Sequence, residues 1–176
     1  VAFTHAYCQS PICTPSRSSF LTGRYPSGVR VNTNGNSHFH RDEPLVTRRL
    51  ADAGYLGGLV GKLHLAGAAY GREARVDDGY AFFRYSHAPR PDWPKGHDYA
   101  AWLVAQGADP VALLRVPDYH DRSGTGAQVP TPERDNVPPP LHQTTWCSEE
   151  AIAFIDEAGD RPWVLSVNAF DPHPPY

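Results

Sequence analysis

The sequence predicts an α/β fold, because two helical patterns each lead into a short apolar run. In Glu43–Ala53 the apolar side chains recur on one helical face, and Tyr55–Val60 follows as a run of strand length. Thr144–Glu157 carries a second apolar helical face, and Trp163–Asn168 follows it in the same way. Both runs predict buried strands, and helices that lead into buried strands are typical of α/β layers.

The first quarter of the chain predicts a strand, a turn, a helix and a loop, in that order. Val1–Tyr7 alternates well enough for a strand. Cys13 lies between two prolines, which indicates a tight turn. Ser16–Thr22 is compatible with a short helix, and Gly23 is a good helix stop. Tyr25–Arg41 contains Pro, Gly and several Asn residues and predicts a loop.

Arg84–Val137 predicts long loops rather than core. This stretch is rich in Pro, Gly, His and Asp, and one helix, at about Tyr99–Gln106, interrupts it. We interpret it as a loop-rich insertion near a binding surface, because loops of this length in compact domains usually carry function.

The composition indicates one ordinary globular domain and excludes several kinds of partner. The chain has 176 residues, and 16 Lys and Arg against 19 Asp and Glu give a net charge of −3, which argues against nucleic acid or a polybasic membrane anchor. No apolar run approaches the roughly 18 residues of a membrane span. Three cysteines are too few for a disulfide scaffold, and without a Cys-x-x-Cys pair they predict no zinc site. Since there is no Met and the chain stops in a turn-rich motif, we expect an internal segment of a longer protein.

The most specific motif begins at Cys13. Residues 13–17 read Cys-Thr-Pro-Ser-Arg, and residues 21–24 read Leu-Thr-Gly-Arg. This pattern resembles the signature of the type I, formylglycine-dependent sulfatases at every fixed position. The resemblance implies that Cys13 is oxidised to formylglycine, whose hydrated aldehyde attacks the sulfur of a sulfate ester. It also implies that Cys13, in this modified form, contacts the metal ion of the family.

The local chemistry of this motif suits an anionic substrate. A helix that begins just after Cys13 would favour anionic oxygen there, through its free N–H groups and its dipole. Arg17 lies one turn further on the same helical face and can hold the diol or neighbouring carboxylates. Rival motifs fail on spacing: a Cys-x5-Arg phosphatase loop would need Arg at position 19, which is Ser19, and Gly61-Lys62 lacks the other residues of a P-loop.

Two further segments resemble the family more weakly. Gly61-Lys62-Leu63-His64-Leu65 resembles its G-K-x-H-L segment, which implies that Lys62 binds the sulfate and the diol and that His64 is the base of the second step. We expect both side chains on one side of an extended segment. Phe170 to Pro175 resembles a P-H-x-P turn, which implies that His173 binds the ester oxygen and helps to protonate the leaving group.

The resemblance also implies a fold, cofactors and partners. The fold is alkaline-phosphatase-like, a mostly parallel sheet flanked by helices, with residues 1–176 as an incomplete part of one catalytic domain and residues 84–137 as an insertion within it. The metal is calcium or magnesium, its other ligands lie outside this chain, and the isolated segment is expected to be inactive. The partners are a sulfated small molecule or carbohydrate and a formylglycine-generating maturation enzyme. Related proteins are often exported, which favours a periplasmic or extracellular location.

Two other interpretations stay open at this point. One is a phosphonate monoester or phosphodiester hydrolase of the same superfamily, which can share the modified cysteine. The other is a non-catalytic binding protein that retains the motif without the modification. The residues alone do not separate these from a sulfatase.

Overall fold

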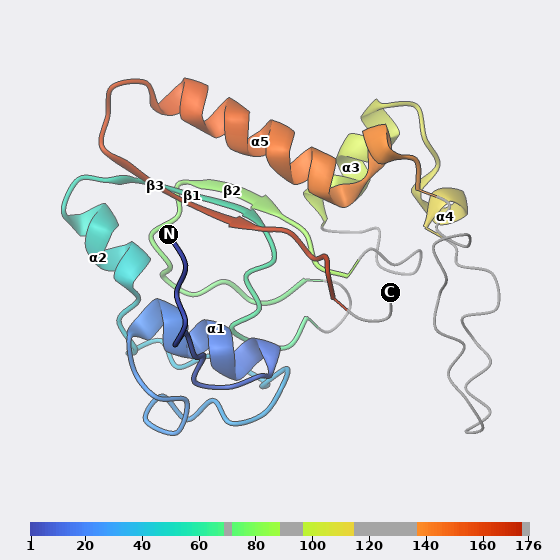
Figure 1. The fold of residues 1–176 in the computed structure, drawn as a ribbon. Helices are drawn as coiled ribbons and strands as arrows, with labels where there is room; N and C mark the ends of the chain where they lie inside the picture. Colours follow the sequence, from blue (N-terminus) through green and yellow to red (C-terminus); the bar gives the residue numbers. More distant parts are fainter. Residues whose placement is uncertain (69–71, 89–96, 115–136, 174–176) are drawn as a thin grey trace, which may run out of the picture.

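The computed structural model describes residues 1–68, 72–88, 97–114 and 137–173. Figure 1 shows a sheet with helices on both faces, α3 and α5 on one side and α1 and α2 on the other. This arrangement confirms the predicted α/β class. In chain order the elements are α1 (Cys13–Thr22), α2 (Val46–Asp52), β1 (Leu56–Gly61), β2 (Phe82–Tyr85), α3 (Asp98–Ala105), α4 (Pro110–Leu113), the 3-10 helix η3 (Pro139–Leu141), α5 (Gln143–Ala158) and β3 (Trp163–Asn168).

β1 is the central strand of a three-stranded parallel sheet with the order β2-β1-β3. The register pairs Leu56 with Trp163 and Gly61 with Asn168, so β1 and β3 run side by side over their whole length. On the other side Gly61 lies opposite Tyr85 at the end of β2. All three strands therefore end at one edge of the sheet, and this is the edge at which α/β sheets bind ligands.

Two apolar cores, one on each face of β1, follow from the alternation of its side chains. Leu59 belongs to the core beside α1 and α2, and Val60 to the core beside α3 and α5. Fully burying an aliphatic or aromatic side chain contributes about 1.5–3 kcal/mol, so these cores hold β1 firmly between the layers. The first core includes Val29, Val31, Leu45 and Tyr85, and the second includes Tyr99, Leu103, Trp146 and Phe154.

α1 begins at Cys13, three residues before the predicted start. Ile12 is still extended, and the N–H of Ser16 donates to the carbonyl of Ile12 at 3.0 Å, which closes the first turn. Gly23 ends the helix as predicted, with φ of 67° and its N–H 2.8 Å from the carbonyl of Ser19. Cys13 is therefore the first residue of the helix rather than part of a separate turn before it.

The predicted strand at Val1–Tyr7 is wrong. These residues are irregular and exposed, and within the described residues none of the three strands pairs with them. Alternation favours a strand only where a neighbouring strand accepts the backbone hydrogen bonds and a core accepts every second side chain. Neither condition is met here.

The helix predicted over Glu43–Ala53 exists but begins later, at Val46. Leu45 is extended, with φ of −87° and ψ of 144°, and buries its side chain in the first core. Pro44 precedes Leu45, and the helix begins only at the residue after Leu45. The apolar periodicity correctly indicated a buried helical face. It also included Leu45, which is buried but lies just outside the helix, so the predicted start was too early.

Residues 84–137 contain more regular structure than the sequence indicates. The last two residues of β2 fall at its start, and α3 and α4 follow within it; α3 lies one residue earlier than the helix predicted at Tyr99–Gln106. β2 escaped prediction because it has only four residues and includes the charged Arg84. Residues 89–96 and 115–136 of this range lie outside the described residues.

The second helix–strand pair is confirmed in its position, but the prediction that its strand is buried is wrong. α5 extends the predicted helix by one residue at each end, and its N-cap is His142, whose Nδ1 accepts from the N–H of Thr144 at 3.2 Å. β3 has the predicted bounds, but Trp163 and Val167 are 41 % and 49 % exposed, because β3 is an edge strand of this sheet. Among the helices that the structure describes, none combines the length and apolar character needed to cross a membrane.

Replacing Gly61 by Ala should destabilise the protein strongly. A Cβ at Gly61 would lie 2.2 Å from the carbonyl oxygen of Asn168, at a φ of 96°. Gly54 is the matched control, since its φ is 88° but a Cβ there meets nothing within 4 Å. We expect Gly54→Ala to cost about 1 kcal/mol of unfolding free energy and Gly61→Ala about 3 kcal/mol or more. Chemical denaturation of the full-length protein measures both, and equal losses would contradict the close approach of β1 and β3.

Candidate active site

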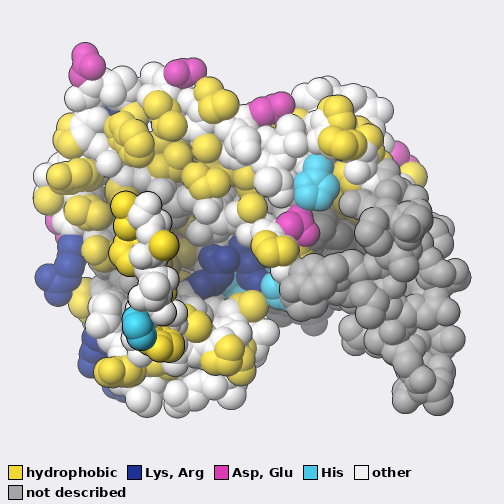
Figure 2. Space-filling model, viewed as in Figure 1, with side chains coloured by type: hydrophobic (Ala, Val, Ile, Leu, Met, Phe, Trp, Pro, Cys, Tyr) yellow, Lys and Arg dark blue, Asp and Glu magenta, His cyan; other side chains and the backbone are white. Residues whose placement is uncertain are grey.

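A hollow of about 440 Å³ lies where β1, β3 and the first turn of α1 meet. Figure 2 shows Lys and Arg side chains gathered in a hollow near the centre of this face. The backbone brings the parts together, because the N–H of Lys62, just after β1, donates to the carbonyl of Asn168 at 3.0 Å. The lining residues are Cys8, Ser10, Pro11, Ile12, Cys13, Ser16, Arg17, Phe20, Lys62, Asn168, Phe170 and His173.

Four of the five predicted site residues line this hollow. The sulfur of Cys13 lies 3.5 Å from Nε2 of His173, and Cys13 is close enough to Lys62 to raise the pKa of its ammonium. Arg17 reaches the same place from one turn along α1, and its guanidinium donates to the carbonyl of Lys62 at 2.8 Å. The structure therefore brings together side chains that are up to 160 residues apart in the chain.

The two cations of the hollow are poorly solvated. Lys62 is 3 % exposed, and burial lowers its pKa, while Cys13 raises it and Arg17 lowers it again. Burial also lowers the pKa of Arg17, but a guanidinium remains protonated in proteins. In a site with little water these charges act on an anion more strongly than they would at the surface. The hollow is thus suited to an anionic ligand.

The fifth predicted residue, His64, lies behind the hollow rather than in its lining. Its Nε2 is 3.3 Å from Oγ1 of Thr14, and its ring packs edge to face against that of His87, with centroids 4.6 Å apart. The segment is not extended at His64 as predicted, because His64 has a φ of 58° and the backbone turns there. Burial, followed by the charges of Lys62 and Arg17, lowers the pKa of His64 to about 3, so the imidazole is neutral.

Glu73 stabilises the turn at His64. The sequence alone did not indicate this role. Its carboxylate accepts from the N–H of His64 at 2.7 Å and from the N–H of Ala66 at 3.4 Å. The side chain is 4 % exposed, and burial raises the pKa of Glu73 to about 7, although the backbone donors oppose this rise. Nothing in the sequence singles out a lone Glu beyond the motif, since its role depends on the path of the chain.

The loop at residues 32–36 is tied to the first turn of α1. Oγ1 of Thr14 donates to Oδ1 of Asn34 at 3.0 Å and accepts from the N–H of Gly35 at 2.9 Å. The N–H of Thr14 also donates to Oδ1 of Asn34, at 3.3 Å. Thr14 is fully buried, so these bonds fix the position of Cys13 next to it.

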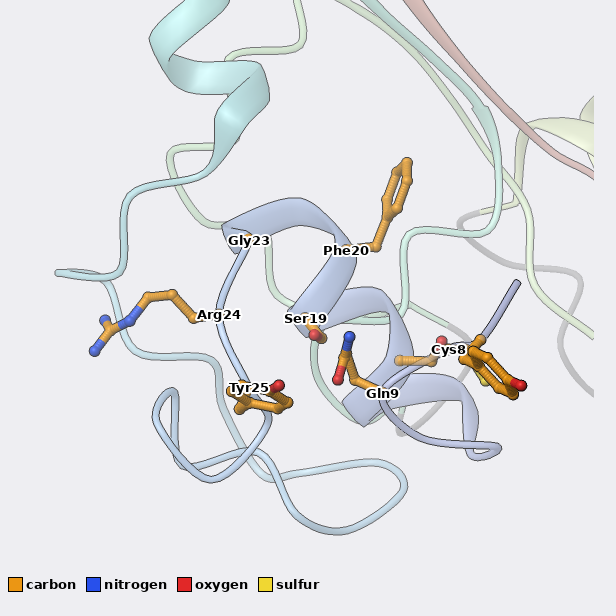
Figure 3. Close-up of a pocket in the computed structure, with 9 residues that line it drawn as sticks. Cys8, Gln9, Ser19, Phe20, Gly23, Arg24 and Tyr25 are labelled. Carbon is orange, nitrogen blue, oxygen red and sulfur yellow. The ribbon is translucent and has the colours of Figure 1, made fainter. Parts of the chain in front are cut away.

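A second hollow, of about 490 Å³, runs along α1 between the N-terminal segment and the residues after Gly23 (Figure 3). It shares Cys8, Ser16 and Phe20 with the first hollow, so the two adjoin. Its lining contains Arg24 but not Arg17 or Lys62. The predicted site residues therefore select the first hollow as the candidate active site.

The described residues do not form a metal site by themselves. They contain no group of three His, Cys, Asp or Glu side chains placed to hold an ion. Glu73 is engaged by backbone donors, and Asp171 lies 3.6 Å from Nε2 of His142. Calcium and magnesium prefer several oxygen ligands, and the described residues place no such set together.

The fold, the motif and the hollow agree with the family to which the chain is related. A family model described as Sulfatase matches residues 1–176, so the chain belongs to the sulfatase family.

Among its relatives, choline-sulfatase of Rhizobium meliloti strain 1021 is 30 % identical over 183 residues, which cover 99 % of this chain and 31 % of the relative. N-acetylgalactosamine-6-O-sulfatase of Bacteroides thetaiotaomicron is 47 % identical over 70 residues, covering 37 % of this chain and 14 % of the relative. The crystal structure of Ps i-CgsB in complex with k-i-k-neocarrahexaose matches with a TM-score of 0.56 at 21 % identity, over 95 % of this chain and 36 % of that one. This likeness shows the alkaline-phosphatase-like fold. The chain thus spans about a third of the length of the relatives that it matches throughout.

The raised pKa of Glu73 predicts a pH-dependent stability. For a carboxyl with a pKa of about 7 in the folded state and 4.5 when unperturbed, the neutral form contributes stability below pH 4.5 that is lost as the pH rises through 7. We expect the unfolding free energy of the full-length protein, relative to Glu73→Gln, to fall by roughly 3 kcal/mol over this range. Denaturant titrations at a series of pH values measure it, with the exposed Glu157→Gln as the control for loss of a carboxylate. A difference that does not change with pH would refute the assignment.

Proposed function

We propose that the full-length protein hydrolyses sulfate monoesters and that Cys13, converted to formylglycine, provides the nucleophile. The observation that carries this proposal is the position of the Cys13 sulfur, at the start of α1, 3.5 Å from Nε2 of His173 and in the same hollow as Lys62. Membership of the sulfatase family supports it.

The residues around position 13 meet the two demands of this reaction, a strong nucleophile and compensation of negative charge. A hydrated formylglycine would supply one oxygen to attack sulfur and a second hydroxyl whose deprotonation later releases sulfate. Lys62 and Arg17 bind the anionic oxygens, and the N-terminus of α1 adds its dipole. Because both cations are already in place before substrate arrives, little reorganisation is needed during reaction.

The two histidines have different proposed roles. His173 lines the hollow, which supports a role in protonating the leaving alcohol. His64 is neutral and can accept a proton, which suits the base of the second step. Its Nε2 lies 3.3 Å from Oγ1 of Thr14, the residue next to position 13.

The proposed cofactor and partners follow from the family and its named members. A calcium or magnesium ion would neutralise further charge, and formylglycine at position 13 would contribute one of its oxygen ligands. The relatives act on choline and N-acetylgalactosamine sulfates according to their names, so we propose a sulfated small molecule or carbohydrate as substrate. The second proposed partner is a maturation enzyme that recognises the Cys13–Arg17 motif. We also propose that the protein is exported.

The first test is the chemical state of position 13. After co-expression with a formylglycine-generating enzyme, mass spectrometry should find an aldehyde in place of the Cys13 thiol, and the full-length protein should hydrolyse 4-nitrophenyl sulfate. Cys13→Ala should lower kcat/KM at least about 10⁴-fold, because the nucleophile is lost. Cys8→Ser is the matched control for removal of a thiol and should keep the aldehyde at position 13.

Other outcomes separate the rival functions. A modified protein that cleaves aryl phosphonates or phosphodiesters faster than aryl sulfates belongs to the other hydrolase class. A thiol that stays unmodified in a host with a competent maturation system, together with no ester cleavage, indicates a binding protein.

The role of His173 predicts a leaving-group effect. In His173→Ala we expect kcat/KM to fall by about 10²–10⁴-fold for sulfate esters of weakly acidic alcohols, which need a proton as they leave. The loss should be much smaller for 4-nitrophenyl sulfate, whose phenolate leaves unaided. The measurement is the slope of log kcat/KM against leaving-group pKa, with the exposed His38→Ala as control. A uniform loss across all esters would argue against proton transfer by His173.

A further inference from the structure

Phe170 lies in the cationic part of the hollow, although the resemblance of Phe170 to Pro175 assigns it no role. It follows β3 by two residues and lines the hollow beside Lys62 and His173. The ammonium of Lys62 lies over its ring, 5.1 Å from the centroid. The ring of His173 stacks on it with centroids 4.5 Å apart and an interplanar angle of 20°. One aromatic ring therefore contacts both Lys62 and His173.

The buried positive charge of Lys62 requires a stabilising partner. Its side chain is buried close to the like charge of Arg17, and in the described part of the chain no carboxylate forms a salt bridge with it. Glu73 acts on Lys62 only at a distance, since its oxygens are held by backbone N–H groups. The electron-rich face of an aromatic ring attracts a cation within about 6 Å of its centroid, and more strongly where water is excluded.

The main chain of Lys62 is fixed, but its side chain can still adopt several conformations. Its N–H is bound by Asn168 and its carbonyl by Arg17, so the main chain is fixed at both ends of the residue. The ammonium still lies at the end of four rotatable carbon–carbon bonds. The ring face of Phe170, 5.1 Å away, is the contact that defines where the charge lies.

We propose that Phe170 is a positioning residue that holds the Lys62 ammonium by a cation–π contact and sets its spacing from His173. This inference rests on the proposed function, because it concerns the same anion-binding site. It assigns the ring an electrostatic role that depends on the electron density of its face and not only on its size.

Stepwise fluorination of Phe170 tests this role without a large change in shape. Replacing Phe170 by phenylalanines with one, three and five ring fluorines removes electron density from the face in stages. In the matured full-length protein, kcat/KM for 4-nitrophenyl sulfate should fall with each stage, to a total of about 10-fold. Phe170→Trp should keep most of the activity, whereas Phe170→Leu should lose at least as much as the fully fluorinated ring.

Phe39 provides the matched control. It is a buried phenylalanine over whose ring the described residues place no cation. The same fluorinated replacements at Phe39 should leave kcat/KM unchanged. A flat response at Phe170, or an equal response at both positions, would overturn the proposal.

A binding measurement separates this inference from the proposed function. Inorganic sulfate is titrated calorimetrically into the full-length Cys13→Ala protein, which needs no turnover, and its affinity should weaken across the same Phe170 series. A wild-type protein that is modified but inactive on sulfate esters would refute the function, while a graded sulfate affinity would still support the role of Phe170. Normal activity with unchanged sulfate affinity across the series would refute the role of Phe170 alone.

Discussion

The parallel register of β1 and β3 is the constraint on which the site depends. It places Gly61 opposite Asn168 and lets the N–H of Lys62 bond to the carbonyl of Asn168. The residues that follow each strand, Lys62 on one side and Phe170 and His173 on the other, then leave the sheet at the same point. Only a residue without a side chain fits between the strands at position 61. The close approach of β1 and β3 therefore depends on Gly61.

Helix α1 brings Cys13, the proposed nucleophile, to the same place. α1 begins at Cys13, and the buried side chain of Thr14 ties its first turn to Asn34 and Gly35. Arg17 then bonds to the carbonyl of Lys62, which links the helix to the end of β1. Helix and sheet are thus joined through polar contacts at the site itself.

The electrostatics around the site combine two cations with two neutral histidines, His64 and His87. Burial and the cations lower the pKa of His64 to about 3 and that of His87 to about 2, so the charge near position 13 comes mainly from Lys62 and Arg17. Such an arrangement attracts an anion while keeping one imidazole able to accept a proton. Glu73 limits the repulsion between the cations and shapes the turn at His64 at the same time.

The sequence by itself determined the features that depend on neighbouring residues. The motif that begins at Cys13 indicated the family, Gly23 marked the end of α1, and apolar periodicity located α5 and β3. These signals lie within a few residues of one another, so backbone preferences and side-chain patterns are enough to read them. Tertiary structure decided the rest: whether Val1–Tyr7 finds a strand partner, which way His64 turns, and that Glu73 and Phe170 reach the site. Those outcomes depend on contacts between segments far apart in the chain, and such contacts leave no local pattern.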